Sequence, residues 1–488
     1  MSDVEGLVKA GVAKRVASIR AMDRDFRAMQ RSKLASILRN CAETEFGRAH
    51  DFGSIASHED YRRAVPPSTA EDYHEAWKRI ASGARNVLFP EPVYSYGLSS
   101  GTTGEPKMVP LTKALVRGLK RAIGYTTASY IALREDYALL RGYALQMAAP
   151  TEVRRTNGDV PVGYITGIMS ASRTYPFHNI GIPPNDVLDL LDWGEKYRLV
   201  EERFAGHDVR MIFGIPGYIL GLLRRLTGSR GLDNLDGLWP NLELVATSGV
   251  ALRPHRPQLE RLCPHARLME TYLCTEGPVA FERTEGPPGM LPMVEDLFLE
   301  FVPEDRWDEE RGPRLALEEV EPGVEYVILL TTPAGLYAYA PGDVVRFTSV
   351  DPPRLVVEGR HGNVLSLASE KLDEAQAESI LARAGLAVEA FSVCPAEAGP
   401  APGHEWVIEF SGSPPTDAAE RIDRAMRAAN PLLRHLREGD LLFAAPRVSP
   451  VRKGTFDAAL RRRPGQGKIL RIYQDRTVRD ELLGTDRA

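Results

Sequence analysis

The sequence of 488 residues has few cysteines, no long hydrophobic run and no excess of basic charge. Its four cysteines (Cys41, Cys263, Cys274 and Cys394) lie far apart and form no C-x-x-C pair, which argues against a disulfide framework or a structural zinc site. No segment approaches the roughly 18 consecutive apolar residues of a transmembrane helix. The first twenty residues lack the apolar core of a secretory signal. We therefore expect a cytoplasmic protein without a membrane anchor.

The charge balance argues against nucleic acid as a partner. Lysine and arginine together number 61, aspartate and glutamate 66, and the formal net charge is -5. Basic and aromatic residues do not alternate in the manner of a nucleic-acid surface. Only 11 of the basic residues are lysines, so a lysine inside a motif rich in glycine or proline carries more information than usual.

The order of predicted elements indicates an α/β fold. The first ninety residues read as helices, and Leu34, Ile37, Leu38 and Cys41 form one face of an amphipathic helix. Further on, short apolar runs alternate with helical stretches, which favours mostly parallel strands covered by helices. The predicted strands are 93–98, 143–148, 209–213, 242–246 and 266–272, with a helix at 216–226.

Beyond residue 320 the pattern changes to short strands joined by tight turns, which predicts an antiparallel sheet or a small β-barrel-like subdomain. These strands are 324–330, 335–340, 343–347 and 354–358. A hinge is expected near 359–364. It separates a large N-terminal domain (1–360) from a smaller, mobile α+β domain (361–488), with helices at 373–384 and 417–429 and strands near 388–393 and 406–410.

The segment SSGTTGEPK, from Ser99 to Lys107, carries the clearest chemistry. It follows a predicted strand and precedes a helix expected after Thr112. Its glycines let backbone amides converge on one point, while four hydroxyls and a lysine add further donors. Many donors and a cation suit a polyphosphate. The spacing is not that of a Walker loop.

Two other interpretations of this segment remain open. Residues 97–101 fit the pattern G-x-S-x-G, the nucleophile elbow of serine hydrolases. An elbow needs a helix directly after its serine, whereas Gly104, Pro106 and Pro110 prolong the loop here. A solvated loop without function is the third interpretation. Phosphate binding is favoured.

Together with other segments, this loop resembles the adenylate-forming superfamily, and most closely the auxin-responsive acyl acid–amido synthetase (Gretchen Hagen) family with its bacterial relatives. The resemblance covers about residues 30–475 in the family's order. The supporting segments are YRRAVPP from Tyr61, YLCTEG from Tyr272, AGLYAYAPGDVVR from Ala334, EGR from Glu358, EKL from Glu370, KGTF from Lys453 and GQGK from Gly465.

The resemblance implies a nucleotide site for ATP and Mg²⁺. Ser99, Ser100, Gly101, Thr102 and Thr103 would hold the phosphates, Gly249, Tyr272 and Thr275 would lie around the adenine, and Asp343 and Arg360 would bind the ribose. Glu276 would hold the magnesium ion, which favours one or two carboxylates together with phosphate oxygens. The expected catalytic lysines are Lys107, Lys371 and Lys468. At 369 this chain has serine where the family has glycine.

The expected activity is that of an ATP-dependent ligase. It would convert a small-molecule carboxylic acid into an acyl-adenylate, release pyrophosphate and transfer the acyl group to an amine, most simply an amino acid. Phe213, Tyr218 and Cys274 are the candidates for lining the acyl pocket. Coenzyme A is the alternative acceptor. A nucleotide-binding protein without catalysis and a serine hydrolase are remoter alternatives.

Overall fold

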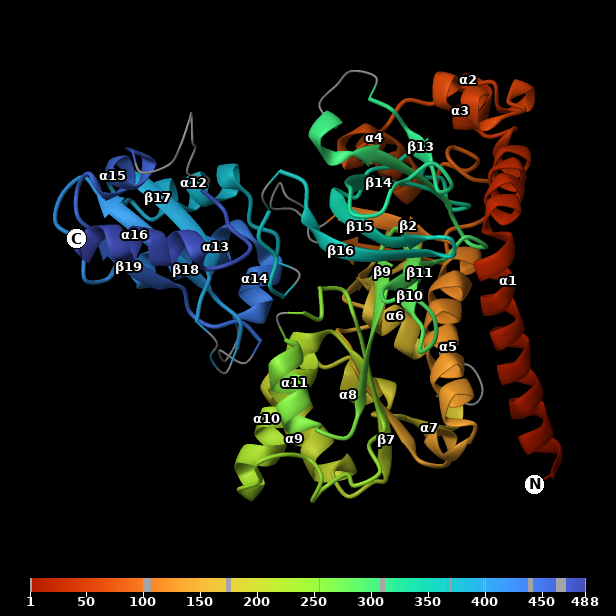
Figure 1. The fold of residues 1–488 in the computed structure, drawn as a ribbon, viewed down its shortest axis with the longest axis horizontal. Coiled ribbons are helices and arrows are strands. Elements are labelled where there is room, and N and C mark those ends of the chain that lie inside the picture. Colours follow the sequence, from red (N-terminus) through yellow and green to blue (C-terminus); the bar gives the residue numbers. More distant parts are fainter. Residues whose placement is uncertain are drawn as a thin grey trace.

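The computed structural model describes residues 2–99, 107–172, 177–253, 255–307, 312–362, 364–368, 370–397, 399, 401–437, 442–461 and 471–487. In Figure 1 a larger body carries the N-terminus, and a smaller body, which begins with α12 (Glu374–Arg383), lies at its side. Within the described ranges, no helix has both the length and the apolar character needed to cross a lipid bilayer.

Four helices open the chain, as the sequence predicts. They are α1 (Ser2–Cys41), α2 (Glu45–Ala49), α3 (His58–Ala64) and α4 (Ala70–Ala81). The predicted apolar face of α1 is confirmed, because Leu34, Ile37, Leu38 and Cys41 are all buried. Ser57 caps α3 by accepting a hydrogen bond from the Asp60 backbone N–H, which stabilises the first turn.

A twelve-stranded mixed sheet forms the centre of the larger body. Its order is β13 (Leu315–Ala316), β12 (Phe298–Pro303), β14 (Glu325–Thr331), β15 (Asp343–Val350), β16 (Pro353–Arg360), β11 (Met290–Pro292), β10 (Gly277–Glu282), β9 (Arg267–Cys274), β8 (Leu244–Ser248), β7 (Val209–Gly214), β3 (Tyr143–Met147) and β6 (Gly181–Ile182). From β9 to β6 the strands run parallel. The predicted antiparallel strands continue this same sheet, because the antiparallel β10 pairs with β9.

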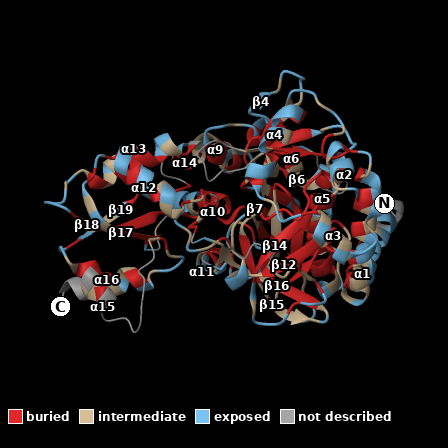
Figure 2. Ribbon diagram, turned by 90° about the horizontal axis from the view of Figure 1, so that it is seen from above, coloured by how far each residue is buried: buried red, intermediate tan, exposed pale blue. Residues whose placement is uncertain are grey.

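Helices cover both faces of the parallel half. They are α5 (Lys113–Arg134), α6 (Ile165–Ala171), α7 (Phe177–Ile180), α8 (Asn185–Leu188), α9 (Trp193–Phe204), α10 (Pro216–Arg230) and α11 (Arg256–Leu262). Along β7, Met211 and Phe213 join the hydrophobic cluster of α5, whereas Ile212 joins that of α9 and α10. On β8, Leu244 joins the cluster of α5, and Val245 joins that of α9 and α10. A strand with a period of two therefore fills two cores. Figure 2 shows buried strands at the centre of the same sheet, around the labels β12 and β14.

A separate four-stranded sheet carries the segment that precedes the glycine-rich loop. Its order is β2 (Lys107–Leu111), β1 (Ser95–Ser99), β5 (Pro161–Tyr164) and β4 (Arg154–Arg155). The sequence predicts the strand at 93–98 but wrongly groups it with the parallel sheet. It also misses β2, whose Pro110 reads as a loop signal. Pro110 is tolerated because β2 is an edge strand.

The strand predicted at 335–340 is wrong. In this segment only Tyr339 makes bridge pairings, with Ser68 and with Leu330. Ala338 has a φ of 46°, in the left-handed region that a strand residue does not adopt. The segment is therefore an irregular connection between β14 and β15, and it turns the Tyr339 ring toward the end of β9, where it meets Glu276.

The smaller body has a three-stranded sheet of β17 (Val388–Pro395), β18 (His404–Phe410) and β19 (Arg447–Val451). Its helices are α12, α13 (Ala418–Ala429), α14 (Pro431–Leu436), α15 (Thr455–Arg461) and α16 (Thr477–Arg487). The predicted cap of α12 is confirmed, since Asp373 and Gln376 form a capping box. The indole N–H of Trp193 in the larger body donates to His435 Nε2 of α14 over 2.8 Å. The expected boundary at residue 360 stays a prediction.

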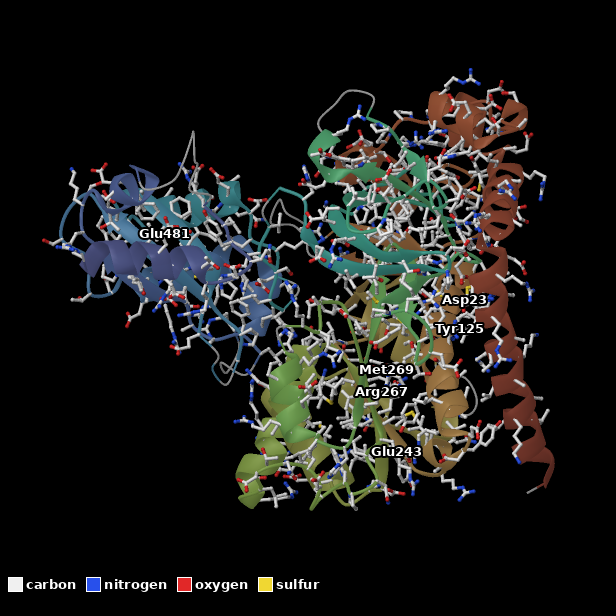
Figure 3. All side chains as sticks on the ribbon, viewed as in Figure 1. Asp23, Tyr125, Glu243, Arg267, Met269 and Glu481 are labelled. Atoms are coloured by element: carbon white, nitrogen blue, oxygen red, sulfur yellow. The ribbon has the colours of Figure 1, made fainter. Side chains whose placement is uncertain are left out.

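The long helix α1 lies along α5 and reaches the sheet through charged contacts. Figure 3 labels Asp23 on α1 and Tyr125 on α5. The Asp23 carboxylate pairs with Arg354 of β16 at 2.8 Å, and also with Arg283. Arg354 is fully buried, so this pair supplies the counter-charge that a buried guanidinium requires. The N-terminal helix is thus attached to the same strand that ends in the candidate site.

A buried charge cluster gives a test of the packing of the N-terminal helices. Glu300 of β12 accepts hydrogen bonds from Arg314 (Nη2 to Oε2, 2.6 Å) and from His58 of α3 (2.7 Å). We expect Glu300→Ala to lower the free energy of unfolding by about 3–5 kcal/mol, because Arg314 would remain buried without its counter-charge. Urea titrations of the wild type and the variant measure this difference.

The matched control is Glu75→Ala, which removes an exposed pair with Lys78 of 3.0 Å. Solvent screens such a pair, so we expect a loss of about 0.5 kcal/mol or less. Equal losses for the two variants would contradict a structural role for the Glu300 cluster.

Candidate active site

A cavity of about 330 Å³ opens at the carboxyl ends of β8 and β9. Open α/β sheets place their ligand sites at this edge. The starting residue of β15, the last residue of β16 and the loop after it form a second wall. Pro395 and Leu432 of the smaller body complete the lining. The cavity is thus formed by both bodies, and residues from several of the motifs identified in the sequence surround it.

The turn between β9 and β10 presents Thr275 and Glu276 to the cavity. Cys274 pairs with Gly277 in the antiparallel register, so these two residues form a two-residue connection. Strand β1 packs directly against this turn: a Cβ atom at Gly97 would lie only 2.5 Å from Thr275 Cγ2. Glycine at position 97 is therefore explained by close packing between the two segments, without any nucleophile elbow.

Asp343 and Arg360 are brought together by strand register. Asp343 begins β15, Arg360 ends β16, and the two residues are direct partners in the antiparallel ladder. Arg360 Nη1 donates to Asp343 Oδ1 over 2.6 Å, and the Tyr272 hydroxyl donates to Asp343 Oδ2. In the described part of the chain, Arg360 Nε is buried and has no hydrogen-bond partner. This unsatisfied donor is what a site for a polar ligand would provide.

Lys371 faces the same cavity from the loop that follows β16. Burial lowers the pKa of Lys371 to about 8, and repulsion from Arg360 adds to this shift. The loop is held by the neighbouring Glu370, which is fully buried. The Glu370 carboxylate accepts from the Ala368 backbone N–H at 2.5 Å and from His404 Nε2 at 2.9 Å. The buried Glu370 carboxylate therefore fixes the backbone that carries Lys371, through its hydrogen bonds with Ala368 and His404.

Glu276 is buried at the cavity and accepts a hydrogen bond from the Tyr339 hydroxyl over 3.2 Å. No group of three or more His, Cys, Asp or Glu side chains that could hold a metal ion occurs among the described residues. A single carboxylate is nevertheless compatible with Mg²⁺, which keeps several waters and takes its other ligands from substrate phosphates. The single carboxylate of Glu276 therefore fits a magnesium ion that binds together with a polyphosphate. It does not fit a metal ion whose ligands all come from the protein.

Not every predicted site residue can be placed. Ser100, Gly101, Thr102, Thr103 and Lys468 lie outside the described residues. Ser99 is the last residue of β1, and its backbone pairs with Lys107 of β2. Lys107 Nζ lies 3.9 Å from Glu71 of α4, and Lys107 is not one of the described residues that line the cavity.

The pairing of the described strands argues against the serine hydrolase interpretation. Strand β1 pairs in antiparallel register with β2, and α5, the next helix of the described chain, begins only at Lys113. A nucleophile elbow requires the helix to begin at the serine itself.

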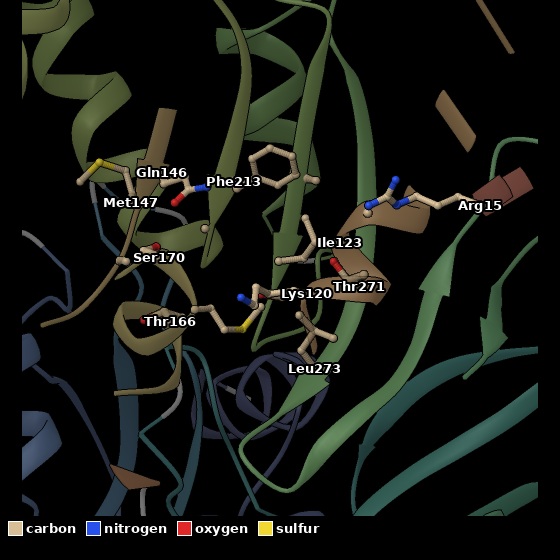
Figure 4. A pocket seen from close by; sticks show the side chains of 16 residues that line it. Arg15, Lys120, Ile123, Gln146, Met147, Thr166, Ser170, Phe213, Thr271 and Leu273 are labelled. Atoms are coloured by element: carbon tan, nitrogen blue, oxygen red, sulfur yellow. The ribbon is translucent and has the colours of Figure 1, made fainter. Parts of the chain in front are cut away.

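The predicted acyl-pocket residues divide between two neighbouring cavities. Tyr218 and Cys274 line the larger cavity, and so does Gly249, which the resemblance places near the adenine. Phe213 instead lines a smaller cavity of about 110 Å³, shown in Figure 4. The two cavities share residues of β9 and α6, among them Leu273 and Met169. Burial raises the pKa of the Cys274 thiol well above its usual value, which agrees with a lining role and not with a nucleophile.

The sequence does not reveal the roles of Glu370, His404 and Tyr339 at this site. Glu370 was noticed only as the neighbour of Lys371, and its role depends on His404, which lies 34 positions away. Tyr339 lies inside the segment that ends in Asp343, but its contact with Glu276 spans 63 positions. The sequence does offer one signal for Tyr339, because this residue lies in AGLYAYAPGDVVR, one of the segments that carry the family resemblance. Nothing local in the sequence indicates the partner of Glu370.

Comparisons with known proteins agree with this geometry. The GH3 family N-terminal domain matches residues 15–200, the GH3 family central domain 290–360 and the GH3 family C-terminal domain 370–477. The chain is 22% identical to indole-3-acetic acid-amido synthetase GH3.3 of Arabidopsis thaliana, with 94% of this chain and 91% of that protein covered. It is 24% identical to jasmonoyl–L-amino acid synthetase GH3.5 of Oryza sativa subsp. japonica, covering 72% and 74% respectively.

Solved structures share the fold over nearly the whole chain. GH3.15 acyl acid amido synthetase superposes with a TM-score of 0.62 at 18% identity, covering 97% of this chain and 95% of that one. A 2-hydroxyisobutyryl-CoA ligase in complex with 2-HIB-AMP and CoA superposes with a TM-score of 0.60 at 15% identity, covering 95% and 93%. By its matched domains and its fold, the chain belongs to the GH3 family.

Proposed function

We propose that this protein is an ATP-dependent ligase that activates a carboxylic acid as an acyl-adenylate and transfers the acyl group to an amine, forming an amide. One observation carries the proposal: Tyr272, Glu276, Asp343, Arg360 and Lys371 come from four segments of the chain and surround one cavity. Its curated relatives include amido synthetases that act on indole-3-acetic acid. An amino acid is accordingly the favoured acceptor.

In the first step, a carboxylate oxygen of the acid attacks the α-phosphorus of ATP. The new C–O–P linkage forms as the bond to the β-phosphate oxygen breaks, and pyrophosphate leaves with that electron pair. Two anions must approach each other, so cationic groups that meet the developing charge lower the barrier. Lys371 supplies such a group at the cavity, and the resemblance gives Lys468 the same task. Magnesium, held through Glu276, would neutralise phosphate charge when bound.

Asp343 and Arg360 are suited to the ribose. A carboxylate has enough acceptor positions for both ribose hydroxyls as well as for Tyr272 and Arg360. The unsatisfied Arg360 Nε offers a further donor beside them. The existing network fixes the Asp343 carboxylate before the nucleotide enters, so binding orders few additional side chains.

In the second step, the nitrogen of a neutral amine attacks the acyl carbonyl, AMP leaves with the phosphate oxygen and the electron pair of the broken bond, and the nitrogen gives up one proton to water. We propose that the smaller domain, residues 361–488, rotates about the segment that follows β16 to admit the acceptor. The smaller body contributes only part of the cavity wall, so such a rotation would open one side of the site. Coenzyme A is the second candidate acceptor, because one structural neighbour is a CoA ligase.

The adenylation step can be measured as ATP–pyrophosphate exchange with a panel of aryl, indolyl and alkyl acids and no acceptor. We expect exchange that requires an added acid. Lys468→Ala should lower it about 10²–10³-fold, because a group aimed at the transition-state charge is lost. ATP binding, measured by calorimetry, should be largely retained.

Lys78→Ala, on an exposed lysine of α4, is the matched control and should leave the exchange unchanged. ATP binding without exchange for any acid would instead favour the nucleotide-binding alternative. Products formed with amino acids or with CoA, separated by mass spectrometry, distinguish an amide-forming from a thioester-forming enzyme.

Asp343→Ala tests the ribose assignment. Hydrogen bonds to a charged group contribute about 1.5–3 kcal/mol each, so losing them should raise the Kd for ATP at least about tenfold. Asp351→Ala is the matched control, because Asp351 lies at the opposite end of the β15–β16 hairpin and is bound to Arg27 on the surface. An unchanged Kd for the Asp343 variant would refute this assignment.

The lowered pKa of Lys371 gives a test by titration. Reductive methylation with ¹³C-formaldehyde keeps lysines titratable, and the resonance absent from Lys371→Arg identifies the residue. We expect a midpoint at about pH 8 for Lys371, against about 10 for the exposed lysines. ATP should raise this midpoint, because neighbouring negative charge favours the ammonium form. Titration of every lysine near pH 10 would place Lys371 outside the charged cavity.

A further inference from the structure

The smaller cavity adjoins the larger one, and Asp343, Arg360 and Lys371 do not line it. Its volume is about 110 Å³, and it shares Thr166, Met169, Ser248, Thr271 and Leu273 with the larger cavity. These shared residues form a common wall of the two spaces beside the end of β9. An acid whose carboxylate lies in the larger cavity would extend its remaining atoms past this common wall into the smaller one. This inference rests on the proposed function.

The walls of the smaller cavity are mainly apolar, but two cations also line it. Ile123, Met147 and Phe213 supply apolar surface. Lys120 of α5 and Arg15 of α1 both line the same space, and Figure 4 shows their side chains directed into it from two different helices. Apolar walls alone would suit a hydrocarbon or aromatic tail, whereas two cations are costly beside such a tail.

Neither cation is neutralised by the protein. Lys120 Nζ donates to the Ser172 carbonyl over 2.5 Å, and Arg15 Nη1 donates to the Gly11 carbonyl over 3.2 Å. Over the described ranges, no carboxylate forms an ion pair with either side chain. By contrast Arg121, the residue after Lys120, pairs with Asp296 at 2.9 Å. Helix α5 therefore compensates one of two adjacent cations and leaves the one at the cavity without a counter-charge.

The position of Arg15 depends on the surface of α5. A Cβ atom at Gly124 would lie 3.0 Å from Arg15 Nε, so glycine gives the guanidinium room to lie against the helix. Arg15 is exposed, whereas Lys120 is partly buried. Burial and repulsion from Arg117 lower the pKa of Lys120, and a bound anion would oppose both effects. The pair thus offers an electrostatic site at the end of an apolar passage.

We propose that the acid activated by this enzyme carries a second anionic group, which Lys120 and Arg15 bind at the far end of the apolar cavity. The substrate class is then a dianionic acid whose charges are separated by a hydrocarbon or aromatic spacer. One carboxylate is activated in the larger cavity, and the other charge fixes the orientation. A monoacid of equal length leaves both cations without an anion, which selects against it.

The test is acid-dependent ATP–pyrophosphate exchange with matched acids that differ only in the second charge. Hexanoate and adipate, octanoate and suberate, and 4-methylbenzoate and terephthalate are three such pairs of different length and rigidity. We expect at least one diacid to exceed its monoacid partner about tenfold or more in kcat/KM. Lys120→Met and Arg15→Met should each lower that ratio about tenfold, because a charge-assisted contact is lost.

Lys120→Arg retains the charge and should preserve most of the preference. This variant also separates loss of charge from loss of folding, which circular dichroism checks for every variant. Lys14→Met and Lys113→Met are matched controls, because these exposed cations lie on α1 and α5 without lining the cavity. For both control variants, the ratio of kcat/KM for a diacid to kcat/KM for its monoacid partner should stay at the wild-type value.

The proposal is overturned, with adenylation intact, if monoacids and diacids are used equally. In that case Lys120→Met and Arg15→Met do not change the ratio of kcat/KM for a diacid to kcat/KM for its monoacid partner. A loss of preference in the Lys14 and Lys113 controls as well would also overturn it, since a general surface potential would then be responsible. Acid-dependent exchange with none of the acids, either here or in the wider panel, would count against the proposed function itself.

Discussion

The candidate site depends on the register of one hairpin. Strands β15 and β16 pair so that Asp343 and Arg360 are direct partners, and their ion pair closes the end of the hairpin beside Tyr272. A shift of either strand by one residue would turn its side chains to the opposite face of the sheet. The ion pair of Asp343 with Arg360 would then be lost.

Around this pair the site combines charges of both signs before any ligand is present. Glu276 and Asp343 provide negative charge, while Arg360 and Lys371 provide positive charge, and all four face the same cavity. Their partners hold them in place: Tyr339 for Glu276, and Glu370 for the backbone beside Lys371. Such an arrangement suits a nucleotide, whose ribose offers donors and whose phosphates require cations.

The sequence predicted those parts of the fold that follow from local chemistry. The cap of α12, the buried face of α1 and the parallel strands of the larger body depend on residues close together in the chain, and each was confirmed. The errors arose where distant contacts decide. Strand β2 contains Pro110, which is allowed only because β2 lies at a sheet edge. The 335–340 segment is apolar enough for a strand, but the left-handed backbone at Ala338 excludes one.

The sequence by itself determined which residues could carry the chemistry, because a tyrosine, an acid or a lysine in a glycine-rich or proline-rich motif is visible without a structure. Tertiary structure decided which of them meet. The strand register joined Asp343 to Arg360, and the buried Glu370 connected the Lys371 loop to His404. The unpaired cations Lys120 and Arg15 lie on two helices that are distant in the chain, and they share a cavity only after α1 packs along α5. Contacts of this kind leave no local pattern, because they arise from the packing of complete elements.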